Sequence, residues 1–197
     1  MVTGMEPRLI LVASVPTLPA WWDIGSCRPS TALSFLPTIP TSAVNCTDWA
    51  SGNATGGIGS YAFSAFYDGI ASGVIVQLAS AVPEGVTLHA GQEHFCGSLR
   101  IGHANTVGVG ACAGCDVPMC IVFDRLIVAT PVPASNRALQ GGANGPGSDF
   151  AHWQDGLEVN PFIGCGLNRG CIHDFSCVAA STPTHGSTWG AVKALYR

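Results

Sequence analysis

Short apolar segments, most of them alternating with small or polar residues, recur along this chain with turn signals between them. No segment places apolar residues at positions i, i+3, i+4 and i+7 over a dozen residues, so no long helix is expected. Alternation with a period of two is typical of strands that bury one side. The segments expected to form strands are residues 8–15, 31–35, 58–67, 71–82, 93–101, 106–110 and 119–130.

This pattern predicts an all-β fold, an antiparallel β-sandwich of jelly-roll or immunoglobulin-like topology. Residues 1–154 are expected to form the sandwich domain, with a long surface loop at 134–149 and a returning strand within 149–154. Residues 155–197 hold three cysteines and little pattern. They are expected to form a tail that disulfides pin to the domain.

Charge is scarce: charged residues make up 10% of the chain, against about 25% in a typical protein. Lys193 is the single lysine, the net charge is −4, and the acidic residues are scattered singly. Binding to nucleic acid is therefore not expected, because no basic patch is present to neutralise phosphates. No run reaches the roughly 18 apolar residues of a membrane-spanning helix, so no membrane span is expected.

Nine cysteines in a chain so poor in lysine and so rich in turn residues indicate a secreted or cell-surface protein with disulfides. Cys27 is expected to pair with Cys46, closing a loop that the chain-entropy model credits with roughly 3 kcal/mol. Cys96 stands alone on an expected strand and is the candidate for a free, inert, buried thiol. The remaining cysteines, Cys112, Cys115, Cys120, Cys165, Cys171 and Cys177, are expected to share bonds between a turn and the tail.

Two functional interpretations compete with disulfides at this turn. Cys112 and Cys115 form a C-x-x-C pair, the spacing of a redox dithiol, and with Cys171 and His173 they give a possible set of zinc ligands. A redox pair normally opens a helix after a strand, whereas Gly114 and Pro118 favour a turn. An exported protein would also oxidise such thiols, so the disulfide interpretation is preferred.

Histidines and tryptophans supply the other candidate sites. His89, Glu93 and His94 form H-x3-E-H, which is conceivable as a copper or zinc site although Gly91 interrupts it and rim residues are commoner. The tryptophans Trp21, Trp22 and Trp49 are candidates for an exposed platform that binds sugar rings; the alternative is that they anchor the core. Adjacent residues on a strand face opposite sides, so Trp21 or Trp22 is expected to be exposed.

Several phrases resemble a group of uncharacterised exported proteins from environmental bacteria: LPAWWDIGSCRPSTALSF, NCTDWASGNATGGIGSY, TVGVGACAGCDVPMCIVFDRLIV and STWGAVKALYR. The resemblance runs from Leu18 to Arg197. It implies that a segment with a signal peptide precedes LPAWW, and residues 1–13 do not read as one. The terminal TWGAVKALYR resembles short C-terminal tags of exported proteins, so it is expected to be either a sorting or anchoring tag or an ordinary docked terminus. The cysteines that correspond to those of the group are Cys27, Cys46, Cys112, Cys115, Cys120 and Cys177; Cys96, Cys165, Cys171 and His94 are additions.

The expected function is that of a secreted or cell-surface structural or ligand-binding module, non-catalytic and without a cofactor. One alternative is a carbohydrate-binding module that uses Trp21, Trp22 and Trp49; another is a metal-dependent enzyme that uses His89, Glu93 and His94. The expected partners are a carbohydrate or a cell-surface protein. A missing N-terminal strand would leave an unpaired edge, through which copies of the chain could associate.

Overall fold

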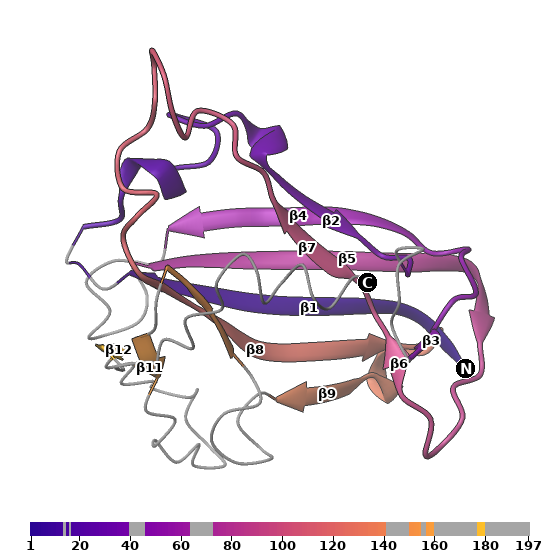
Figure 1. The fold of residues 1–197 in the computed structure, drawn as a ribbon. Coiled ribbons are helices and arrows are strands. Elements are labelled where there is room, and N and C mark those ends of the chain that lie inside the picture. The colour runs from indigo at the N-terminus through magenta and orange to yellow at the C-terminus, as the bar shows by residue number, and fades with distance from the viewer. Residues whose placement is uncertain are drawn as a thin grey trace, which may run out of the picture.

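The structure, a computed structural model, is built from strands and confirms the all-β prediction (Figure 1). It describes residues 1–13, 15, 17–39, 46–63, 73–140, 150–154, 157–159 and 177–179. Among these residues no helix is long and apolar enough to cross a membrane. In chain order the elements are β1 (Val2–Ala13), η1 (Ala20–Trp22), η2 (Ser30–Ala32), β2 (Leu33–Leu36), β3 (Thr47–Asp48), β4 (Thr55–Phe63), β5 (Gly73–Val86), β6 (His94–Phe95), β7 (Ser98–Ile101), β8 (Met119–Ala129), η3 (Pro133–Ser135), β9 (Arg137–Gln140), β10 (Phe150–Trp153), β11 (Leu157–Val159) and β12 (Cys177–Ala179).

A six-stranded antiparallel sheet forms the body of the protein, in the order β10-β8-β1-β5-β4, with β9 also paired to β8. β1 lies in its centre, with Leu11 opposite both Val74 of β5 and Ile121 of β8. Its run of Leu9 to Val12 suits this place, because a central strand needs apolar side chains on both faces. β1 is therefore not an unpaired edge; within the described part of the chain, β4 forms one edge of this sheet and β9 and β10 form the other.

One face of this sheet, here called the covered face, carries a hydrophobic core of two clusters. The first joins Leu11, Val74 and Met119 to Trp21 and Trp22 of η1 and to residues of the antiparallel pair β2–β7. In the second, Met5 packs with Trp49, close to the parallel pair β3–β6. Met5 and Leu11 are six residues apart on one strand, so they point to the same face. Two short sheets and their loops thus lie over the covered face (Figure 1).

Most strands expected from the pattern are present with shifted ends, and three expectations need correction. Residues 106–110 form a loop and not a strand. The expected strand at 93–101 is divided into β6 and β7 at Gly97, whose φ of +151° and close approach to the Phe35 ring exclude a side chain. The loop expected at 134–149 contains η3 and β9; residues 141–149 lie outside the described part. The returning strand, β10, is confirmed by its pairing with β8.

The strand β1 begins six residues earlier than expected. Its first half was not recognised as a strand because it contains Gly4 and Pro7, residue types that are uncommon in strands. Proline is rare in a central strand, since it cannot donate to the ladder. Here the ladder is irregular beside it: Arg8 pairs with Arg125, and Leu9 pairs with Phe123. Asp124 is the extra residue of this bulge on β8, and bulges accommodate such breaks in a sheet.

Candidate functional site

A disulfide between Cys27 and Cys112 lies at the base of the loop formed by residues 102–111. The two Cα atoms are 5.9 Å apart, although the residues are 85 apart in the sequence. The predicted pairing of Cys27 with Cys46 is wrong, and Cys46 carries a free thiol. Nearness in sequence suggested that pair. The fold instead brings the turn before β8 against the segment after η1.

Cys96 is a free thiol, as predicted, and its burial raises the pKa of that thiol. Cys115, which was expected to bond to the tail, is also free. The side chains of Cys120 and Cys177 lie outside the described part of the chain, as do Cys165 and Cys171 entirely, so the bonds predicted for them stay predictions.

The tryptophans expected to form an exposed platform are buried, which corrects that prediction. Trp21, Trp22 and Trp49 expose 0%, 1% and 3% of their surface. Trp21 and Trp22 lie on the 3-10 turn η1 and not on a strand, so neither is turned outward. Trp21 stacks on Trp153 with 4.9 Å between ring centroids, and Trp22 meets both rings edge-on. They anchor the core and cannot serve as a sugar-binding platform.

Arg28 fastens η1 to the loop at 102–111. Its side chain is buried, and its guanidinium lies 3.6 Å from the centroid of the Trp21 ring, within the range of a cation–π interaction. The guanidinium donates hydrogen bonds to backbone oxygens of Trp21, Gly102 and Ala104. Burial lowers the pKa of Arg28, and Tyr61 and Cys115 act in the opposite direction. One buried cation therefore joins three backbone carbonyls, and two of these, of Gly102 and Ala104, belong to the loop.

Hydrogen bonds fix both ends of the loop at 102–111, here called its feet. Asn105 Nδ2 donates to the Cys27 carbonyl, and the Cys112 amide donates to the Asn105 carbonyl. Trp21 Nε1 donates to Thr106 Oγ1 at 2.9 Å. Between these anchors, Val107 is 85% exposed and Val109 is fully exposed. The glycines that follow them have φ values of +88° and +83°, a conformation that favours glycine and shapes the tip.

Tyr61 of β4 joins the same cluster from the sheet, because its hydroxyl donates to the Trp22 carbonyl. Burial, and then the charge of Asp23, raise the pKa of Tyr61, while Arg28 opposes this rise. The folded state thus resists ionisation of this phenol.

Raising the pH above 10, the ordinary pKa of a tyrosine, is therefore expected to destabilise the protein through Tyr61. The unfolded chain then loses a proton that the folded chain keeps, so the free energy of unfolding falls by up to about 1.4 kcal/mol per pH unit. Urea titrations of the wild type and Tyr61→Phe from neutral pH upward measure this. Plotted against pH, the free energies of unfolding of the two proteins should run parallel below pH 10, with the variant lower because it lacks the hydrogen bond. Above pH 10 the two plots should converge, because only the wild type loses stability through Tyr61. Curves that stay parallel would contradict the assignment.

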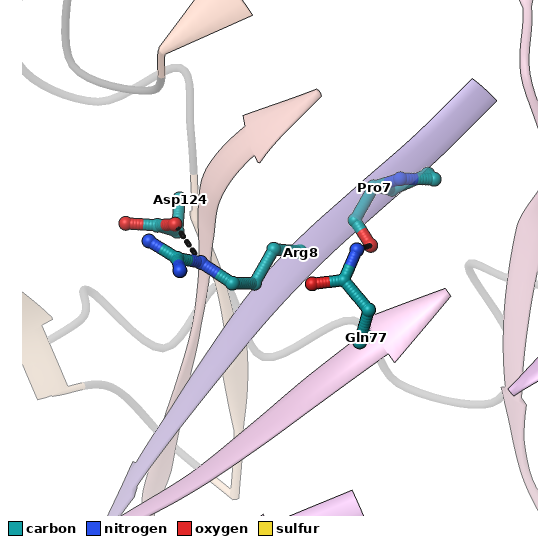
Figure 2. A network of polar contacts seen from close by, with 4 residues as sticks. All are labelled: Pro7, Arg8, Gln77 and Asp124. Atoms are coloured by element: carbon teal, nitrogen blue, oxygen red, sulfur yellow. Dashed lines mark hydrogen bonds and ion pairs between the residues drawn. The ribbon is translucent and has the colours of Figure 1, made fainter. Parts of the chain in front are cut away.

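The opposite face of the sheet holds a second candidate site (Figure 2). Arg8 reaches from β1 to Asp124 on β8, and Gln77 of β5 donates its amide to the Pro7 carbonyl at 3.4 Å. The side chain of Asp124 is 7% exposed and that of Arg8 is 22% exposed. Arg125 lies directly across from Arg8, so Asp124 is inserted where two arginines face each other.

A double-mutant cycle of Arg8→Met and Asp124→Asn is expected to give a coupling of about 1.5 kcal/mol in the free energy of unfolding. This lies above the usual worth of an exposed pair, because Asp124 is nearly buried. Asp124→Asn alone should cost more than the coupling, since it leaves Arg8 opposite Arg125 uncompensated. Chemical unfolding of the wild type, the two single variants and the double variant at low and at high salt measures this coupling energy. A coupling of zero at both would show that this contact contributes nothing.

Next to this ion pair lies a shallow trough of about 470 Å³ between β1, β4, β5 and β8. Small residues dominate its lining, and Glu6 is the one charged residue in it. The register places most of these residues on the face opposite Met5 and Leu11. The lining residues are Thr3, Gly4, Glu6, Thr55, Gly56, Gly57, Ile58, Gly59, Ala79, Ser80, Ala81 and Ala129.

The histidine motif does not form a site. His89, Glu93 and His94 all belong to the described residues, and among these no three His, Cys, Asp or Glu side chains are placed to hold a metal ion together. His94 lies on β6, where neither ring nitrogen has a hydrogen-bond partner in the described part. Glu93 comes just before β6, and its backbone carbonyl accepts from Thr47.

Comparison with protein-family models, curated proteins and solved structures found no match to this chain. The candidate residues therefore come from the geometry alone. Sequence reasoning did not single out Arg28, Tyr61, the ion pair of Arg8 with Asp124, or the loop tip. The one available signal was T-V-G-V-G at 106–110, in which valines alternate with glycine; that alternation was taken for a strand.

Proposed function

We propose that this chain is a secreted or cell-surface module with a structural or ligand-binding role and no catalytic one. The observation that carries the proposal is the Cys27–Cys112 disulfide at the base of an exposed loop. Disulfides form and persist in oxidising compartments and are rare in the cytosol. The resemblance to exported bacterial proteins points to the same compartment and adds a proposed sorting role for residues 188–197.

The finer architecture belongs to the same proposal. The two short sheets over the covered face would be the second layer of a β-sandwich of jelly-roll or immunoglobulin-like topology. Support comes from the two hydrophobic clusters, which both lie between the large sheet and this layer. The tail at 155–197 would be pinned to the domain through Cys120 and Cys177, which lie on β8 and β12.

The binding element of this module would be the loop at 102–111 in place of the tryptophans. Rigid scaffolds commonly present functional residues on loops. Here a disulfide, a buried arginine and three further hydrogen bonds fix the feet of the loop, while Val107 and Val109 stay in solvent. A fixed loop loses little conformational entropy when it binds, so even a small apolar tip contributes to affinity. A protein at the cell surface suits such a tip better than a sugar does.

Expression of the chain with and without a bacterial signal peptide tests the compartment and the module together. The exported protein is expected to resist protease. Its Cys27 and Cys112 should not react with an alkylating reagent, because they are joined in a disulfide. The cytosolic protein should be cleaved faster and should alkylate at both positions. Equal protease resistance in the two compartments, with both cysteines free in each, would refute the proposal.

A further inference from the structure

The tip of the loop at 102–111 is apolar and uncharged. Residues 104–111 read ANTVGVGA, and Val107 and Val109 are among the most exposed large hydrophobic residues described. Exposed apolar side chains are common singly, but here two of them, separated by one glycine, lie on a loop whose two ends are fixed. Such an arrangement favours a partner with an apolar recess.

The trough on the opposite face of the sheet is a recess of this kind. Its volume of about 470 Å³ lies within the range of sites that hold small molecules, and it has room for short, branched side chains. Ala79, Ala81, Ala129 and Gly57 leave this space because they carry little or no side chain. A Cβ placed on Gly57 would meet nothing within 4 Å.

Tip and trough lie at opposite ends of the large sheet. The trough involves the first residues of β1 and β4. The loop is fastened to η1, which packs on Leu11 and Met119 near the far end of β1 (Figure 1). A single chain therefore cannot be expected to fill its own trough with its own tip. One copy can use both at once, with two different neighbours.

We propose that the loop tip of one copy docks into the trough of a second copy, with Val107 and Val109 as the inserted side chains. This rests on the proposed binding role of the loop. Both surfaces suit an uncharged partner, since the tip has no charge and the trough has Glu6 alone, and a second copy of this chain offers the matching surface to each. The contact is heterologous, so it builds chains or rings and not a closed two-fold dimer. Its small area makes it weak and dependent on concentration.

Sedimentation velocity of the oxidised full chain, from about 10 μM to about 1 mM, tests the proposal. The weight-average mass of the wild type is expected to rise over this range. Val107→Ser with Val109→Ser should lower the association constant about 100-fold, since each buried valine is worth roughly tenfold or more. Gly57→Leu, which fills the trough, should have a similar effect. Val132→Ser, at an exposed valine elsewhere, is the matched control and should change nothing.

Mixing the two defective proteins gives the decisive result. The valine variant keeps its trough and the Gly57→Leu variant keeps its tip, so the mixture should form a one-to-one complex and nothing larger. A wild type that stays monomeric with its disulfide intact would overturn this inference and leave the proposed function standing. Association that survives both variants would point to pairing through an edge of the large sheet, at β4 or at β9 and β10, and would also overturn it. Loss of the disulfide from exported protein would instead refute the proposed function.

Discussion

Replacing Cys112 with serine is expected to lower the free energy of unfolding by about 4 kcal/mol. The disulfide to Cys27 spans 85 residues, and the entropy that a cross-link removes from the unfolded chain grows with the length of the loop. Cys27→Ser should cost the same, and the double variant no more than either single one, because one bond is lost in every case. Urea unfolding of the oxidised proteins measures these values.

Cys46→Ser is the matched control, because Cys46 is a free thiol that is also partly buried. It should change the free energy of unfolding by less than about 1 kcal/mol. If Cys46→Ser were as costly as Cys27→Ser, and Cys112→Ser were harmless, Cys27 would be paired with its nearer neighbour in sequence. The loop at 102–111 would then lack its covalent anchor.

Replacing Trp21 with alanine is expected to cost about 4 kcal/mol, the usual range for removing a buried aromatic side chain. Trp21 is completely buried. Its ring stacks on that of Trp153, and the Arg28 guanidinium also lies over it. Its loss also leaves Thr106 without the indole donor and opens a cavity beneath the loop. Thermal and chemical unfolding measure the change.

Two controls separate the causes. Trp21→Phe keeps an aromatic ring beneath Arg28 and removes the indole donor, so it should cost roughly half as much. Leu139→Ala truncates a side chain that is 56% exposed and should cost less than about 0.5 kcal/mol. A Trp21→Ala variant as stable as Leu139→Ala would mean that Trp21 is exposed, which would restore the sugar-binding interpretation.

The β architecture could be predicted because its signal is local. The alternation at 58–67 and the β-branched run at 71–82 mark β4 and β5 with shifted ends. The alternation of small and apolar residues at 106–110 has the same appearance. It became a loop because nothing pairs with it in the described part and because Gly108 and Gly110 adopt positive φ. Pattern alone therefore identifies candidate strands and does not say which of them find a partner.

The candidate site could not be predicted, because its contacts join residues far apart in sequence. Arg28 and Gly102, Tyr61 and Trp22, and Arg8 and Asp124 carry no mutual spacing that a motif could describe. The cysteines show the same limit. Their number indicated an oxidising compartment, but the pairing depends on which turn the sheet brings beside Cys27. Trp21 and Trp22 were misassigned because η1 was not expected, and a 3-10 turn orients neighbouring side chains differently from a strand.

The Cys27–Cys112 disulfide can be detected in a peptide map of exported protein that has not been reduced. Trypsin leaves Cys27 in residues 9–100, since Pro29 blocks cleavage after Arg28, and Cys112 in residues 101–125. A chymotrypsin cut after Phe35 then separates Cys27 from Cys46. The expected result is a peptide containing Cys27 that is linked to the peptide containing Cys112. A link from Cys27 to the peptide containing Cys46, or free thiols at both Cys27 and Cys112, would contradict it.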